Sequence, residues 1–253
     1  MQHLCEPAPE DRRSKLLFDL NGHALALSRS DSDYREALNG ADVVHVDGEP
    51  LVFASKLLTS TPVRERSATT DLIYDIAADA AAEGKSFFLI GGTEGLAADA
   101  AARLKDHFPD LIIAGHHHGY FQEAEEAEIF EKINASGADI VWVGLGKPKE
   151  QLFAVRAQDK LHAGWIITCG GCFNFIVGHY TRAPRWMQSS GLEWLHRLAT
   201  RPREFVWRYL TTNPVALCML ILHSASGEKR QPAPDSNGSG LNLTQKSGQS
   251  VAD

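Results

Sequence analysis

Short apolar runs alternate along the chain with longer segments whose apolar residues recur every three or four positions. The apolar runs are KLLFDL, ADVVHV, KSFFLIG, DLIIAG, ADIVWVGLG and GWIITCGG. Consecutive apolar positions of this length are typical of parallel strands that are buried on both faces. The segments between them, such as TDLIYDIAADAAAEG and GLAADAAARLKDHFP, predict amphipathic helices that end at Gly or Pro. This alternation of strands and helices predicts an α/β fold with a doubly wound, Rossmann-like, mostly parallel sheet.

The same pattern divides the chain into four predicted segments. Residues 1–14 precede the first apolar run and are expected to be a flexible N-terminus. Residues 15–182 hold the strand and helix alternation, and residues 183–223 follow it as a separate segment. Residues 224–253 are polar and rich in Pro, Gly and Ser, a composition that cannot bury enough apolar surface to fold and therefore predicts a disordered tail.

Composition and charge narrow the function classes. The net charge is -7, and this acidic balance argues against general nucleic-acid binding, which needs a basic face. The N-terminus has no apolar segment of the kind found in signal peptides, and the apolar run PVALCMLIL is too short to span a bilayer as a helix. The chain is therefore expected to be cytoplasmic. Cys169-x-x-Cys172 has the spacing of redox and zinc motifs, but without a second such pair a buried structural pair is the favoured interpretation.

Chemically useful residues follow several predicted strands, at the edge where ligands bind in sheets of this type. Asp47 follows the second strand, where it is either a general base or a cap of the next helix; from the residues alone, capping is the more common role. The GGTEG segment after the third strand would let backbone amides approach an anion. It lacks the G-x-G-x-x-G fingerprint, which argues against a dinucleotide-binding oxidoreductase, and GLGKPKEQ lacks the P-loop pattern.

The segment GHHHGYF offers two interpretations. His116 and His118 would share one face of an extended segment and could bind a metal ion. No H-E-x-x-H motif or carboxylate cluster accompanies them, so a turn that positions Tyr120 is the favoured interpretation.

Taken in order, these segments resemble the WecG/TagA/CpsF glycosyltransferases, glycosyltransferase family 26, over residues 15–212. The resemblance rests on ADVVHVDGEPLVFASKLL, FFLIGGTEG, GHHHGYF, DIVWVGLGKPKEQ, GGCFNFIVGHYTRAPRWMQSSGLEWLHRL and RPREFVWRYL. It implies an inverting, metal-independent transfer of N-acetylmannosamine or a related hexose, without a cofactor. The implied donor is a UDP-sugar, and the acceptor is a polyprenyl-diphosphate-linked glycan of exopolysaccharide, capsule or cell-wall polymer synthesis.

The resemblance also assigns roles to residues of this chain. Asp47 matches the catalytic aspartate and would be the general base. The remaining matches to pocket positions imply substrate binding by Asp19, Asn21, Arg66, Gly119, Tyr120, Gly146, Glu150 and Asn174. Three of these depart from the family pattern: Asp19 replaces a usual Thr, Glu150 and Gln151 exchange a usual Gln-Glu pair, and Asn174 replaces a usual Asp.

The stretch GLEWLHRLATRPREFVWRYL concentrates arginines and aromatic residues in an acidic chain. Alone, it favours a core-facing helix with solvated arginines. The resemblance instead implies that residues 183–223 form a helical, membrane-facing appendage. In this appendage Arg197, Arg203 and Arg208 would bind the diphosphate, while the aromatic residues rest on the inner face of the cytoplasmic membrane. The expected partners are thus the two substrates and a membrane surface, with a homo-oligomer left open and nucleic acid excluded. The alternative is a catalytically impaired scaffold subunit that binds nucleotide sugars.

Overall fold

The computed structural model describes residues 13–58, 62–190 and 192–225. In these residues six strands form one sheet in which every pairing is parallel, in the order β2-β1-β6-β5-β3-β4. The strands are β1 (Lys15–Leu20), β2 (Val43–Val46), β3 (Ser86–Gly91), β4 (Ile112–His117), β5 (Ile140–Gly144) and β6 (Trp165–Thr168). The predicted parallel α/β fold is confirmed.

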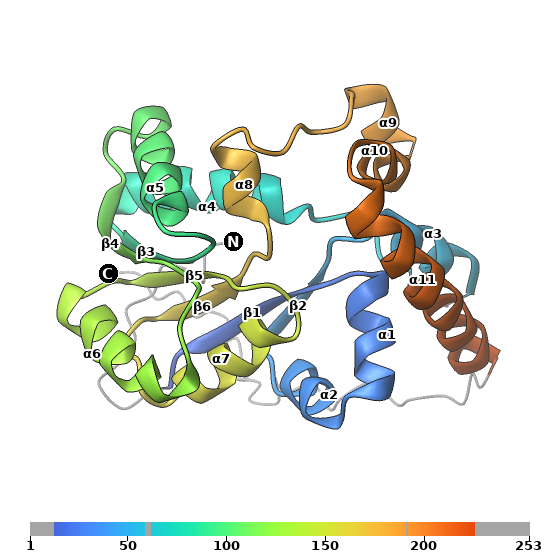
Figure 1. The fold of residues 1–253 in the computed structure, drawn as a ribbon, viewed down its shortest axis with the longest axis horizontal. Coiled ribbons are helices and arrows are strands. Elements are labelled where there is room, and N and C mark those ends of the chain that lie inside the picture. The colour runs from blue at the N-terminus through green and yellow to red at the C-terminus, as the bar shows by residue number, and fades with distance from the viewer. Residues whose placement is uncertain (1–12, 59–61, 191, 226–253) are drawn as a thin grey trace, which may run out of the picture.

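Helices cover both faces of the sheet (Figure 1). One face carries α4 (Thr69–Glu83), α5 (Leu96–His107) and α8 (Cys172–Ile176). The other carries α2 (Ser32–Asn39), α6 (Glu126–Ser136) and α7 (Lys149–Ala157), with the short helix η1 (Glu123–Glu125) before α6. Successive side chains of a strand point to opposite faces, so a strand between two helical layers must be apolar at every position. This is the reason that the apolar runs of the sequence are continuous rather than alternating.

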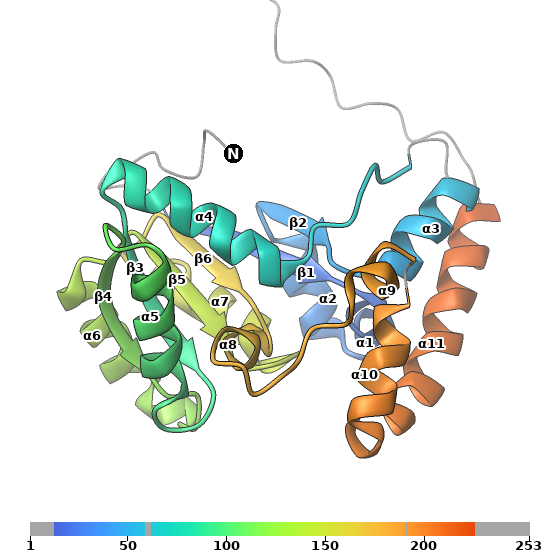
Figure 2. The same cartoon turned by 90° about the horizontal axis from the view of Figure 1, so that it is seen from above.

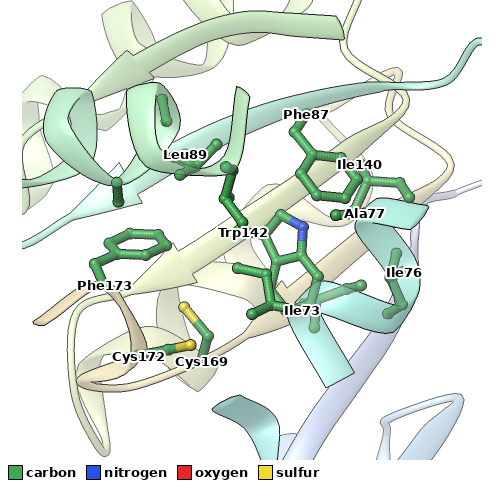
Figure 3. Close-up of a cluster of buried hydrophobic side chains, with 14 of the residues drawn as sticks. Ile73, Ile76, Ala77, Phe87, Leu89, Ile140, Trp142, Cys169, Cys172 and Phe173 are labelled. Atoms are coloured by element: carbon green, nitrogen blue, oxygen red, sulfur yellow. The ribbon is translucent and has the colours of Figure 1, made fainter. Parts of the chain in front are cut away.

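The core beneath α4 is centred on Trp142, which lies among Ile73, Phe87 and Leu89 (Figure 3). Burial of each such side chain contributes about 1.5–3 kcal/mol. The same cluster includes Cys169 and Cys172, which are both buried and free. These two thiols therefore act as small apolar side chains in this structure, and burial raises the pKa of Cys172.

Glycines let backbone segments approach one another where the central strands end. Gly91 of β3 pairs with Gly144 of β5. A Cβ atom on Gly91 would lie 2.3 Å from the carbonyl oxygen of Gly144, and Gly91 has a φ of 149°. The loop after β4 then approaches closely, since the Gly119 amide donates to the Gly92 carbonyl at 2.8 Å. Glycine is therefore required at the ends of these strands so that the backbone segments can pack this closely.

The C-terminal residues form α9 (Arg185–Ser189), α10 (Glu193–Thr200) and α11 (Pro202–Ala225). Helix α11 packs against α1 (Gly22–Ser30) and α3 (Glu49–Leu58), so these helices lie together at one end of the molecule (Figure 2). Among the residues that the structure describes, no helix is both long and apolar enough to cross a membrane. The first two residues of the predicted tail, 224 and 225, belong to α11, and the rest of the tail and most of the predicted N-terminal segment lie outside the described residues. Ser14 is described, and it is buried, with its hydroxyl donating to the Ala163 carbonyl at 2.7 Å.

Candidate active site at the carboxyl edge of the sheet

Charged side chains from distant parts of the chain meet where the strands end. Because all strands are parallel, their carboxyl ends lie along one edge, which is where sheets of this kind bind ligands. Two groups of residues form there. The buried cluster consists of Asp19, Lys147, Glu150, Gln151 and Thr168. The arginine cluster consists of Asp47, Arg66, Glu193 and Arg197.

Lys147 is the centre of the buried cluster. It follows β5 and reaches past the end of β6 to Asp19 on β1. Its Nζ atom donates to Asp19 Oδ1 at 2.6 Å and also to Oδ2, and it lies 3.4 Å from Glu150 Oε1. All three residues are almost fully excluded from solvent. One ammonium group therefore compensates two carboxylates that would otherwise be very costly to bury.

Glu150 joins the turns that follow β5 and β6. Its Oε2 atom accepts from the Gly146 amide at 3.0 Å and from the Gly170 amide at 2.9 Å. Its Oε1 atom accepts from Gln151 Nε2 at 3.2 Å, and Gln151 continues the network to Thr168. Both glycines have positive φ angles, 76° and 52°, a region that favours glycine. The exchanged Glu-Gln pair thus has a structural role in this chain.

The pKa values of Lys147 and Glu150 reflect the compensation of the two buried carboxylates by one ammonium group. Burial lowers the pKa of Lys147, but Asp19 and Glu150 outweigh burial and leave the pKa of Lys147 above its ordinary value. Burial raises the pKa of Glu150, and Lys147 offsets that rise only in part. The cluster is therefore stable as an ion pair network with a lysine that stays charged at every physiological pH.

Arg66 contacts both carboxylate residues of the arginine cluster, Asp47 and Glu193. Its Nε atom donates to the Asp47 backbone carbonyl at 2.8 Å, and its Nη2 atom lies 3.3 Å from Asp47 Oδ1. Its Nη1 atom donates to Glu193 Oε2 at 2.6 Å. Arg197 donates to the other oxygen of Glu193 through Nε at 3.2 Å and through Nη2. The loop before α4 is thereby joined to α10.

The electrostatic surroundings of Asp47 come from four elements. Burial raises its pKa, and the neighbouring charge of Asp19 at the end of β1 raises it further. The positive charges of Arg66 and Arg197 lower the pKa of Asp47, and His45 of β2 acts in the same direction. The net result is a pKa above the ordinary value, so Asp47 is a stronger base than an exposed aspartate.

Asn21 lies at the junction of the two clusters. Its Oδ1 atom accepts from the Ala24 amide at 3.1 Å and so caps α1, while its Nδ2 atom lies 3.4 Å from Asp19 Oδ2. A Cβ atom on Gly48 would lie 3.3 Å from the Asn21 Cα atom, so the turn after Asp47 runs directly against Asn21.

The loop with Gly119 and Tyr120 is held by Lys149. The Lys149 Nζ atom donates to the carbonyls of Gly119 at 3.0 Å and Phe121 at 3.2 Å, and it lies over the Phe121 ring. The Tyr120 side chain is 75% exposed. The neighbouring histidines have no metal-binding partners, because the described part of the chain contains no group of three His, Cys, Asp or Glu residues that could hold a metal ion.

The remaining predicted site residues are spread more widely. Asn174 lies on α8, half-buried, and its carbonyl accepts from the Tyr180 amide at 3.0 Å. Arg203 is exposed on α11, and the side chain of Arg208 lies outside what the structure describes. Of the three predicted arginines, the structure thus places Arg197 beside Asp47. Arg201, which the sequence analysis did not select, stacks 3.5 Å from the centre of the Tyr180 ring.

Glu193 was missed as a functional candidate in the sequence, and so was the bond of Lys147 to Asp19. Lys147 lies in the segment that fails the P-loop pattern, and it bonds to Asp19 across 128 positions. Glu193 precedes Arg197 by four positions on a helix, which is the spacing of a helical ion pair, and this signal was available. Its bond to Arg66 spans 127 positions and had no local signal.

The chain matches a known protein family over most of its length. The model of the family described as "Glycosyl transferase WecG/TagA/CpsF family" matches residues 1–230, which is most of the chain. The match confirms the resemblance that the ordered sequence segments indicate.

Proposed function

The chain belongs to the WecG/TagA/CpsF glycosyl transferase family and is therefore a glycosyltransferase of polysaccharide synthesis, and on this premise we propose its donor and acceptor. The donor is a UDP-sugar that carries N-acetylmannosamine or a related hexose, and the acceptor is a polyprenyl-diphosphate-linked glycan. The observation that carries the proposal is the contact of Arg66 with Asp47, which joins a partly buried carboxylate of raised pKa to a cluster with two guanidinium groups.

Asp47 is the general base in this proposal. Its carboxylate takes the proton from the acceptor hydroxyl as the hydroxyl oxygen attacks the anomeric carbon of the donor. The bond from that carbon to the diphosphate oxygen breaks at the same time, so UDP leaves and the configuration is inverted. Arg66 contacts the Oδ1 atom of Asp47, which assigns the proton to Oδ2. The raised pKa of Asp47 supports this role because a more basic carboxylate accepts a proton more readily.

The guanidinium groups of Arg66 and Arg197 stabilise the UDP leaving group in this proposal. Negative charge grows on the diphosphate as its bond to the sugar breaks, and fixed positive donors near it stabilise the transition state. Arginine suits this purpose because its planar fork matches the geometry of phosphate oxygens. Arg66 and Arg197 are held within one ion pair network beside Asp47, which supports their assignment to the donor diphosphate.

Exposed apolar side chains support a peripheral contact with the inner face of the cytoplasmic membrane. Trp207 and Leu210 of α11 are 74% and 66% exposed, and Trp186 of α9 is also exposed. Helix α3, which packs against α11, adds Phe53 and Leu57 at 64% and 68% exposure. These helices lie at the same end of the molecule (Figure 2). Tryptophan and aliphatic side chains of this kind favour the lipid interface, where a polyprenyl-linked acceptor also lies.

The experiment that tests the proposal is transfer to a synthetic polyprenyl-diphosphate-linked acceptor from a panel of UDP-sugars, with the product identified by mass spectrometry. The Asp47→Asn variant should bind UDP and lose about 10²–10⁴-fold in turnover, which is the usual effect of removing a general base. Asp71→Asn is the matched control, because Asp71 bonds to Arg182 outside the arginine cluster.

Near-normal turnover in Asp47→Asn would remove Asp47 from the mechanism. Binding of UDP-sugars without transfer from any donor to any acceptor would favour the scaffold subunit instead. Either result is readily separated from misfolding, because UDP binding is measured on the same samples.

A further inference from the structure

Glu193 occupies the space between the two guanidinium groups that the proposed function assigns to the donor. Its two carboxylate oxygens are divided between the arginines, with Oε2 2.6 Å from Arg66 Nη1 and Oε1 accepting from Arg197 Nε and Nη2. The side chain is almost completely buried. The Nε and Nη2 edge of Arg197 is the edge with which arginine grips a carboxylate or a phosphate, and Glu193 already fills it.

Charge balance shows what this arrangement means for an anionic ligand. Arg66 and Arg197 contribute two positive charges, and Asp47 and Glu193 contribute two negative charges, so the arginine cluster is neutral as it stands. A diphosphate that entered this neutral group would meet two buried carboxylates at close range, which is repulsive. With Glu193 withdrawn, the same group carries one net positive charge and two unfilled guanidinium edges.

Protonation does not withdraw Glu193. Burial raises its pKa, but Arg197 and Arg66 outweigh burial and bring the pKa down to about 2. The side chain therefore stays charged under all physiological conditions, and it can leave the arginines only by moving. It lies in the first turn of α10.

We propose that Glu193 is a positioning residue. Its carboxylate occupies the positions on Arg66 and Arg197 that the donor diphosphate will take, and it moves away from both arginines when the diphosphate binds. This inference rests on the proposed function, because it identifies the occupant of the arginines with the diphosphate of a UDP-sugar. Glu193 keeps two neighbouring guanidinium groups together in the empty enzyme, where they would otherwise repel each other. It also competes with the product, so it promotes release of UDP after transfer.

The direct test is the affinity of the full chain for UDP, uridine and inorganic pyrophosphate, measured by titration calorimetry on wild type, Glu193→Gln and Glu193→Asp. Glu193→Gln removes the competing charge and should bind UDP and pyrophosphate about tenfold more tightly, as expected for loss of one close ionic competitor. Uridine carries no phosphate, so its affinity should not change. Glu193→Asp keeps the charge with a shorter reach and should give a smaller gain.

The matched control is Asp71→Asn, which breaks the bidentate contact with Arg182. This contact ties the loop before α9 to α4 and makes no hydrogen bond to the arginine cluster, although the charge of Arg182 interacts with those of Glu193 and Arg66. If loosening of that segment alone altered nucleotide binding, Asp71→Asn would alter it too. We expect the UDP and pyrophosphate affinities of this variant to change much less than those of Glu193→Gln, and its uridine affinity to equal that of wild type.

Steady-state kinetics provide a readout that a purely structural role would not produce. Tighter UDP binding slows product release, so Glu193→Gln should lower KM for the donor and lower kcat together. Unchanged or weaker UDP and pyrophosphate binding in folded Glu193→Gln or Glu193→Asp would overturn the inference, because Glu193 would then only orient the arginines. If none of the three proteins binds UDP but Glu193→Gln still binds pyrophosphate more tightly than wild type, the role of Glu193 towards a diphosphate stands and the proposed UDP donor is wrong.

Discussion

Replacing Lys147 by Met is a sharp test of the buried cluster. Methionine fills a similar volume without charge, so the substitution leaves Asp19 and Glu150 buried without the ammonium group that lies 2.6 and 3.4 Å from them. Removing one partner of a buried ion pair costs about 3–5 kcal/mol because the remaining charge is uncompensated. Asp19 retains its contact with Thr168, and Glu150 retains two backbone amides, so the variant should still fold. The loss is a large part of the stability of a typical domain, about 5–15 kcal/mol.

The pH dependence of this loss has a definite sign. The folded-state pKa of Lys147 is raised, so the stabilisation that its ion pairs supply is fully present below the ordinary lysine pKa of about 10.4. It is lost only as the pH rises through the raised value. The folded-state pKa of Glu150 is also raised, so the folded protein takes up that proton more readily than the unfolded chain. Without Lys147 this rise is larger, and acidification relieves the buried charge. The cost of Lys147→Met should therefore be greatest near pH 7 and smaller at pH 5.

Urea denaturation at pH 7 and pH 5 measures both effects. Lys149→Met is the matched control, because Lys149 lies two positions away at the start of α7 but donates to two backbone carbonyls. It should lose about 1–2 kcal/mol, with little change between the two pH values. Asp19→Asn combined with Lys147→Met removes one of the two stranded carboxylates and should recover part of the loss. A loss below about 1 kcal/mol at pH 7, or an equal loss at both pH values, would refute the reasoning.

Three further predictions concern the fold, the exchanged pair and the membrane surface. Gly91→Ala should lower the free energy of unfolding by about 3 kcal/mol or more by calorimetry, because its Cβ atom would collide with the Gly144 carbonyl oxygen; an unchanged melting temperature would contradict this packing. Glu150→Gln should lower stability by about 1–3 kcal/mol in urea denaturation, since an amide NH₂ must face either the backbone amides or Lys147. Wild-type stability in that variant would show that Glu150 is not the hub of the two turns. Trp207→Ser should weaken flotation with anionic vesicles while leaving transfer to a short soluble acceptor intact, and equal flotation of the two proteins would argue against the lipid contact.

The continuous apolar runs were sufficient to predict the parallel sheet and the edge at which its charged residues gather. This prediction succeeds because a strand between two helical layers must be apolar at every position, and that constraint is visible in a few consecutive residues. The same local information placed Asp47 directly after β2. It did not separate a capping role from a basic one, because both roles use the same carboxylate at the same strand end. The family resemblance, rather than periodicity, was needed to propose the base.

Only the tertiary structure decided which charges meet. Lys147 reaches Asp19 because only β6 separates β5 from β1 in the sheet. The order of strands in a sheet has no signature in the residues of any one strand. Glu193 finds Arg66 because α10 comes to lie beside the loop before α4. A local pattern reports which residues are buried, since burial is a property of each position. Compensation between buried charges is a property of pairs, and in the Lys147–Asp19 and Arg66–Glu193 pairs the two members are more than a hundred positions apart. Folding brings them together, because a buried carboxylate is tolerated only where a cation or a set of hydrogen-bond donors reaches it.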